Sequence, residues 1–113
     1  MDKSTHFDVD ALDVLAEVME EEFPDLIQVY LSDSEPRIDA MRDALAAADN
    51  ETLRELAHSF KGASSNLSAI PLSELCYSIE RAGRDNELGN VAHDIDAVEK
   101  EFAAVKSILS GML

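Results

Sequence analysis

The chain has 113 residues, which is enough for one compact domain with a single core and too few for two. Its formal net charge of −15, from 24 acidic and 9 basic residues, disfavours nucleic acid and anionic membrane surfaces as partners. A single cysteine, Cys76, excludes a disulfide framework and a zinc site, and without a long apolar run or a signal-peptide segment we expect a cytoplasmic protein.

Helical periodicity begins close to the N-terminus. Residues 1–7 are predicted to form a flexible lead-in, and a short helix over about residues 8–19 should follow and cap one end of the fold. A second helix is predicted over residues 23–48. Because its apolar register continues across Pro36, we expect one kinked helix there and not two separate ones.

Three more helices complete the pattern. The third is predicted over residues 51 to about 68, where the Ile70-Pro71 pair imposes a boundary, and the fourth runs from Pro71 to about Gly83. The fifth shows the alternating spacing of four and three that is typical of a bundle seam, with Val91, Ile95, Val98, Phe102, Val105 and Leu109. The fold class is therefore all-α: an antiparallel up-down-up-down four-helix bundle with a short extra N-terminal helix, formed as one domain over residues 8–110.

One histidine is predicted to face solvent, where it could react with another molecule. The third helix has an apolar stripe, and His58 points roughly 170° away from the centre of that stripe. The same outward face is predicted to carry Arg54, Lys61, Gly62, Ser65 and Ala69. The imidazole should therefore face water, where another protein can reach it.

Two neighbours strengthen this interpretation of His58. A glycine inside a helix costs about 1 kcal/mol relative to alanine, and core packing does not explain Gly62 on the exposed face. Its missing side chain would leave the approach to His58 open. Lys61, one turn beyond the histidine, carries a compact positive charge suited to the oxygens of a phosphoryl group.

A simpler explanation exists for each of these residues. A histidine on a helix is usually a solvated polar residue, and Lys61 and Ser65 could each be ordinary surface residues. His6 and His93 are interpreted as solvated, Tyr30 and Cys76 as core, and the three scattered histidines have no metal-ligand spacing. No glycine-rich phosphate loop or nucleophile elbow is present, so we expect no metal and no cofactor on this chain.

The chemistry available to His58 is nucleophilic. A neutral imidazole offers a lone pair and can form a covalent intermediate. Phosphoryl transfer to a ring nitrogen requires positioning and charge neutralisation, while a partner holding an aspartate would supply the metal and the carboxylates.

The segment Ala57-His58-Ser59-Phe60-Lys61-Gly62, with small residues at 63–65 and an apolar residue at 67, resembles the motif of the HPt (histidine phosphotransfer) family. That motif reads Ala-His-x-apolar-Lys-Gly-x-x-x-x-apolar-Gly, and the resemblance extends over about residues 8 to 109. It departs at Ser68, where the family often has glycine, so the third helix could end differently there.

This resemblance implies a function. A free-standing bacterial HPt protein is a phosphocarrier without kinase activity of its own. It would accept a phosphoryl group on His58 from the receiver-domain aspartate of a hybrid sensor kinase and pass it to a response regulator, with magnesium bound to the receiver. Lys61 would neutralise the phosphoryl charge, and Gly62 would keep the approach open. Arg54 and Ser65 are expected at the docking surface, and a monomer is expected because a paired bundle buries its own core.

Three alternatives remain. An acidic helical adaptor or inhibitor that never carries phosphate would explain the charge and the bundle but not the grouping of His58, Lys61 and Gly62. The phosphoacceptor helices of a histidine kinase would show a glutamate directly after the histidine, where this chain has Ser59. A metal or haem bundle is the weakest alternative, because a Glu-x-x-His pair is missing.

Overall fold

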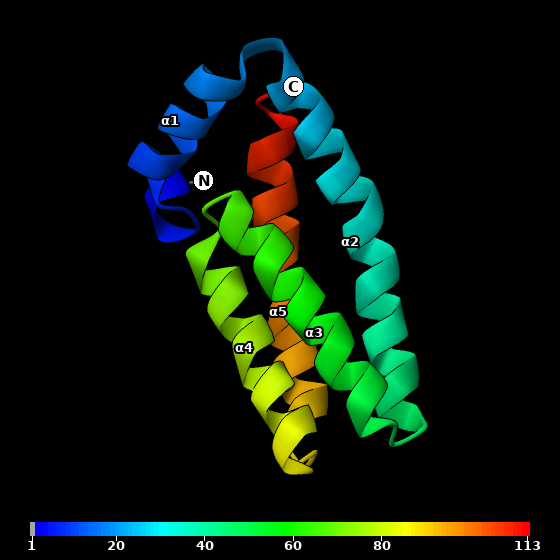
Figure 1. Ribbon diagram of the computed structural model, residues 1–113. Helices are drawn as coiled ribbons and strands as arrows, with labels where there is room; N and C mark the ends of the chain where they lie inside the picture. The colour runs from blue at the N-terminus through cyan, green and yellow to red at the C-terminus, as the bar shows by residue number, and fades with distance from the viewer. Residues whose placement is uncertain (1) are drawn as a thin grey trace.

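The computed structural model describes residues 2–113, and all regular secondary structure in that range is helical (Figure 1). The elements in chain order are η1 Lys3–Thr5, α1 Val9–Met19, η2 Glu20–Glu22, α2 Phe23–Ala46, α3 Asn50–Asn66, α4 Ile70–Asp85 and α5 Val91–Ser110. The predicted all-α class is thereby confirmed. No helix in the described range is long and apolar enough to cross a membrane.

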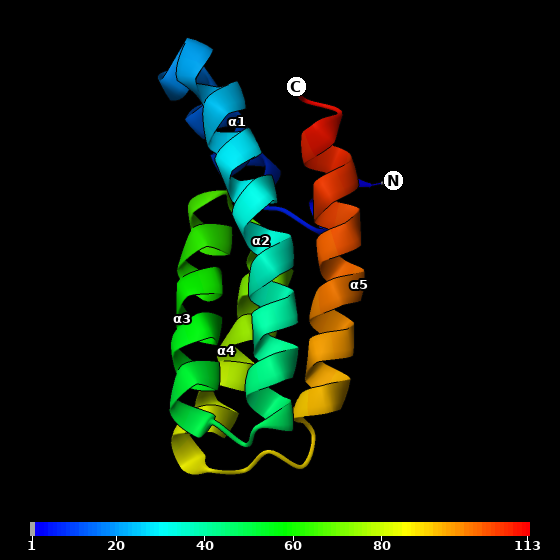
Figure 2. The same ribbon diagram turned by 90° about the vertical axis from the view of Figure 1, so that its right-hand side faces the viewer.

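The four long helices form an antiparallel bundle. Contacts join α2 to α3, α3 to α4, α4 to α5, and α5 back to α2, so that α3 lies diagonally across the bundle from α5. All four helices run along a shared long axis (Figure 1 and Figure 2). The up-down-up-down bundle predicted from the sequence is confirmed.

The short helix α1 lies at one end of the bundle, beside the connection between α3 and α4 (Figure 1). The Asp8 backbone N–H donates to the Ser68 carbonyl oxygen at 2.9 Å, and the Asp8 side chain caps α1 by accepting from Ala11 N. The expectation that the first helix caps one end of the fold is therefore met.

Helix boundaries follow local chemistry. α2 is one helix that includes Pro36, so the prediction of one helix and not two is confirmed. It ends at Ala46 and not at Ala48, because Ala48 adopts a left-handed backbone with φ of 51°. The side chain of Asp49 then caps α3 by accepting from Thr52 N. Asn86, with φ of 58°, ends α4 in the left-handed conformation that asparagine tolerates.

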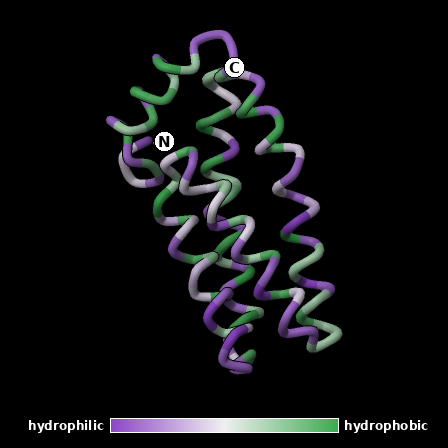
Figure 3. The backbone as a smooth tube through the Cα atoms, viewed as in Figure 1, coloured by the Kyte–Doolittle hydropathy of each residue, from purple (hydrophilic) through white to green (hydrophobic). Residues whose placement is uncertain are grey.

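Apolar and polar residues alternate along each helix in the amphipathic pattern (Figure 3). The core includes three aromatic rings, Tyr30, Phe60 and Phe102, whose centroids lie 6.0 to 6.2 Å apart. Tyr30 and Cys76 are buried, as the sequence indicated. This core holds α3 in a fixed rotation and thereby decides which of its residues face outward.

The N-terminal segment differs from the expected flexible lead-in. Residues 3–5 form a 3-10 helix capped by Asp2, whose side chain accepts from Ser4 N. Phe7 is buried, with 4% of its surface exposed. The interpretation of His6 as solvated is wrong, because its Nδ1 lies 2.7 Å from Glu101 Oε2 on α5. Burial of Phe7 explains the difference, since it attaches the segment to the core. Residue 1 lies outside the described range.

Candidate functional site

His58 lies on the outer face of α3. The buried residues of this helix are Leu53, Ala57, Phe60 and Ser64, all on the side that faces the bundle. The His58 side chain therefore projects outward, and 66% of its surface is exposed. The orientation inferred from helical periodicity agrees with the structure.

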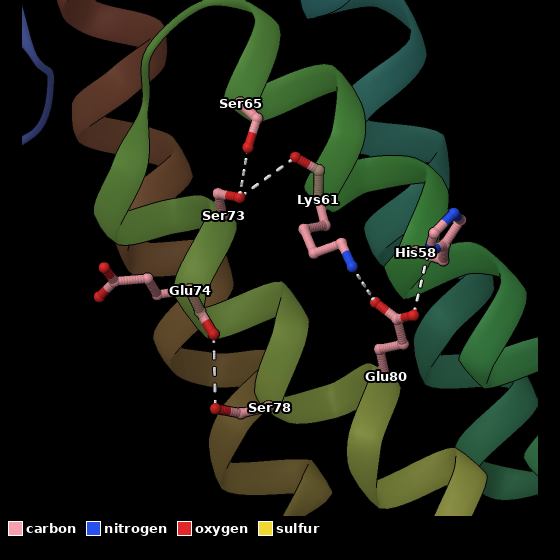
Figure 4. A network of polar contacts seen from close by, with 7 residues as sticks. All are labelled: His58, Lys61, Ser65, Ser73, Glu74, Ser78 and Glu80. Atoms are coloured by element: carbon pink, nitrogen blue, oxygen red, sulfur yellow. Dashed lines mark hydrogen bonds and ion pairs between the residues drawn. The ribbon is translucent and has the colours of Figure 1, made fainter.

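The imidazole has a carboxylate partner on the neighbouring helix. Glu80 of α4 places its Oε2 atom 2.9 Å from Nδ1 of His58 and its Oε1 atom 2.6 Å from Nζ of Lys61 (Figure 4). The Glu80 side chain is only 16% exposed, whereas that of Lys61 is 27% exposed. A single carboxylate thus holds both polar side chains that α3 presents at this point.

Glu80 is ionised at neutral pH. Partial burial of the carboxyl tends to raise its pKa, but the contacts with Lys61 and His58 stabilise the charged form and outweigh burial, so the pKa is lowered overall. An ionised carboxylate can only accept hydrogen bonds.

The contact with Glu80 assigns the tautomer of the neutral histidine. Because the carboxylate accepts, the ring proton must lie on Nδ1 of His58, and the lone pair lies on Nε2. In Figure 4 this second ring nitrogen points away from Glu80. The site therefore presents an unprotonated nitrogen to an approaching molecule.

Gly62 leaves open space one turn beyond His58. The residue is exposed in the middle of α3, and a Cβ atom built on it would meet nothing within 4 Å. No atom of the chain therefore requires glycine at this position. The space remains available to a partner, as the sequence interpretation proposed.

The other residues assigned to the outward face differ in their exposure and contacts. Ser65 is exposed, and its Oγ lies 2.8 Å from Oγ of Ser73 on α4, so its hydroxyl links the two helices (Figure 4). Arg54 is partly exposed and lies 3.7 Å from Glu51. The placement of Ala69 on this face is wrong, because α3 ends at Asn66 and Ala69 is fully buried before α4.

Sequence reasoning did not identify Glu80. Its helix was recognised as amphipathic, but a spacing of 22 residues from His58 carries no periodic signal, and which face of α4 meets α3 depends on packing. Glu80 directly follows the buried Ile79 and comes three residues after Tyr77, so it lies at the edge of the apolar face of α4. This position was the signal in the sequence that could have suggested it.

Other chemistries have little support at this site. Within residues 2–113, no group of three or more His, Cys, Asp or Glu side chains is placed to hold a metal ion. Burial raises the pKa of the Cys76 thiol to about 12, so the sulfur stays protonated and unreactive at neutral pH.

Comparisons with known proteins found a family match and a structural match. The sequence model of the Hpt domain family matches residues 25–108. Among solved structures, the chain is similar to the crystal structure of histidine-containing phosphotransfer protein B (HptB) from Pseudomonas aeruginosa PAO1, with a TM-score of 0.92 and 40% sequence identity. The match covers 95% of this chain and 93% of that chain. No curated protein matches the sequence.

Proposed function

The chain belongs to the Hpt domain family and is a histidine phosphotransfer protein of a phosphorelay, and from that premise we propose that His58 is the residue that carries the phosphoryl group. The donor is the phosphorylated aspartate of a receiver domain in a hybrid sensor kinase, and the acceptor is the receiver domain of a response regulator. The observation that carries the proposal is the exposed imidazole whose Nδ1 is held by Glu80, which leaves Nε2 free to react.

The transfer is a single displacement at phosphorus. The Nε2 lone pair of His58 forms the N–P bond while the P–O bond to the aspartate breaks, and the aspartate leaves as a carboxylate with the bonding electrons. The ring gains positive charge and keeps its Nδ1 proton. The Nδ1–H group donates a hydrogen bond to the Glu80 carboxylate, which stabilises that charge. The second transfer reverses this step towards another aspartate.

Lys61 and Gly62 assist the approach of the phosphoryl group. The Lys61 ammonium is partly exposed beside His58 and can neutralise phosphoryl oxygens while it also contacts Glu80. Gly62 removes a side chain where the partner must come close. Arg54 and Ser65, which border the same face, belong to the surface that the receiver covers.

The chain acts as a carrier in this scheme. The receiver domains supply the magnesium and the aspartate, and this chain supplies the nucleophile and its orientation. We propose that it works in the cytoplasm, and as a monomer because the apolar faces of its four long helices are buried against one another. It has no kinase activity of its own in this proposal.

The test is direct transfer from a phosphorylated receiver. The pure chain is incubated with magnesium and a panel of receiver domains that have been phosphorylated with acetyl phosphate, and intact mass is then measured before and after acid treatment. We expect one added phosphoryl group that is lost in acid. Its absence with every receiver would reject the carrier function and favour an acidic helical adaptor.

A matched pair of variants tests whether His58 is the residue that carries the phosphoryl group. His58→Gln should abolish phosphorylation with unchanged helical circular dichroism, because the side chain projects into solvent. Ser59→Ala, which changes the exposed neighbour, should be phosphorylated like the wild type. Phosphorylation of His58→Gln would place the phosphoryl group on another residue.

A further inference from the structure

An exposed aromatic side chain lies beside the phosphoacceptor site. Tyr77 of α4 is 43% exposed, although large apolar side chains in this chain are mostly buried. The Lys61 ammonium lies 5.1 Å from the centroid of its ring, and the Arg81 guanidinium lies 5.8 Å from it. The Tyr77 ring thus lies close to two cations, Lys61 of α3 and the exposed Arg81 of its own helix α4.

Tyr77 and Arg81 lie on the helix that supplies the partner of His58, and Tyr77 contacts Lys61 of the site. They stand one helical turn apart on α4, and Glu80 lies between them in sequence while it contacts His58 and Lys61 on α3. We call Tyr77 and Arg81 together the α4 patch. A partner that covers His58 and extends towards α4 would meet this patch next.

Charge is distributed very unevenly over the chain. Residues 50–85, which contain α3 and α4, have five acidic and four basic residues, for a net charge of −1. The rest of the chain has 19 acidic and five basic residues, for a net charge of −14. The two helices that carry the site are therefore nearly neutral within a strongly acidic protein.

Arg81 is the cation in this region without a carboxylate partner. Lys61 is paired with Glu80, and the remaining two cations of α3 and α4 are paired with Glu51 and Asp85. No ion pair within residues 2–113 involves Arg81. Its charge is available to an acidic group on another molecule.

We infer that the α4 patch docks the acidic rim of the receiver's phosphorylation pocket and thereby contributes to selection of the partner. This inference rests on the proposed function, in which the partner holds an aspartate, further carboxylates and magnesium. A pocket of that kind is surrounded by negative charge, which the strongly acidic remainder of this chain repels and the α4 patch attracts. Tyrosine and arginine are also among the residues that contribute most to binding energy at protein interfaces.

The test separates binding from chemistry. Initial rates of transfer to the chain are measured against the concentration of a receiver domain phosphorylated with acetyl phosphate, in magnesium buffer at several salt concentrations. Arg81→Glu should raise KM, the receiver concentration at which the single-turnover rate is half-maximal, by about fivefold or more at low salt. The maximal rate constant should be unchanged, and the difference from wild type should shrink as salt increases. Tyr77→Ala should raise KM at every salt concentration.

Lys100→Glu is the matched control. Lys100 is exposed on α5, which lies diagonally across the bundle from α3, and the substitution changes the net charge by the same amount. Its KM should stay within about twofold of wild type. Equal effects of Arg81→Glu and Lys100→Glu, or no effect of either, would overturn the docking role.

Failure of this inference is distinguishable from failure of the proposed function. If the wild-type chain is phosphorylated on His58 but Arg81→Glu has the wild-type KM, the carrier function stands and the α4 patch has no docking role. If no receiver phosphorylates the wild-type chain, both are rejected.

Discussion

The Glu80 carboxylate on α4 lies 2.9 Å from Nδ1 of His58 on α3, and this contact determines which nitrogen of the neutral imidazole carries the proton. The same carboxylate lies 2.6 Å from the Lys61 ammonium. One side chain from a neighbouring helix therefore orients the imidazole and restrains the cation beside it. Substitutions at these positions should separate the two effects.

Replacing Glu80 should slow the transfer without disturbing the fold. Glu80→Ala removes the acceptor of the Nδ1 proton. We expect single-turnover phosphorylation of His58 to fall by about tenfold, by analogy with the loss of carboxylates that orient metal-ligating histidines. Glu80→Gln keeps an oxygen acceptor and should retain more of the rate. Nitrogen NMR of the ring should show loss of the Nδ1-protonated tautomer in Glu80→Ala. A wild-type rate in that variant would exclude the positioning role.

The same carboxylate should contribute to the dependence of stability on pH. In the folded chain the Glu80 pKa is lowered from 4.5, so its contribution to stability is present above pH 4.5 and is lost as the pH falls through the lowered value. Urea unfolding at pH 7 and below pH 4.5 should show a larger loss of stability for the wild type than for Glu80→Gln. Equal losses in both proteins would contradict this prediction.

Lys61→Ala should slow transfer but not abolish it, because the proposed nucleophile His58 is still present. The loss of the ammonium also leaves the Glu80 carboxylate uncompensated beside the incoming phosphoryl group. The double variant Lys61→Ala with Glu80→Gln should therefore be faster than the product of the two single effects predicts. The check is a double-mutant cycle on single-turnover rates. Additive effects would mean that the two residues act independently, and an unchanged rate in Lys61→Ala would make the lysine an ordinary surface charge.

Two glycines on adjacent helices should respond oppositely to the same substitution. A Cβ on Gly83 would lie 2.9 Å from the Asn50 carbonyl oxygen and 3.1 Å from Arg54 N, both backbone atoms of α3. Gly83→Ala should therefore destabilise the fold by about 1–3 kcal/mol through the forced separation of α3 and α4.

Gly62→Ala is the matched comparison. Its Cβ meets nothing within 4 Å, so the better helix propensity of alanine should stabilise the fold by up to about 1 kcal/mol. Urea unfolding of both variants checks the sign of each change. Destabilisation by Gly62→Ala would reveal a constraint at Gly62 other than access to His58.

Ser68→Gly should make the protein more stable. Ser68 has φ of 61°, a left-handed conformation that costs a residue with a Cβ atom about 1–2 kcal/mol. Glycine relieves this strain but adds conformational entropy to the unfolded chain, so we expect a net gain of roughly 0.5–1 kcal/mol. Thermal unfolding should show a higher midpoint than wild type. The control Ser68→Ala keeps the backbone strain and should show no rise in the midpoint. An equal rise in Ser68→Ala would mean that loss of the hydroxyl, and not relief of strain, stabilises the protein.

Much of the fold could be predicted from the sequence because helical periodicity is a local signal. The spacing of apolar residues in α3 placed His58 on the outside, and Lys61 and Gly62 follow from the same 3.6-residue repeat. The seam of α5 was recognised in the same way. Errors occurred where periodicity stops: Ala69 was assigned by continuing the repeat past Asn66, where Ser68 turns the chain.

The helices, the all-α class and the outward position of His58 follow from the amino-acid sequence alone, since each depends on residues within a few turns of one another. The partner of the His58 imidazole, by contrast, depends on the tertiary structure. Glu80 contacts His58 from 22 residues away in the sequence. In the N-terminal segment, Phe7 is buried in the core and His6 contacts Glu101. The physical reason is that contacts between elements depend on the rotation and approach of whole helices, which packing sets collectively and no local spacing records.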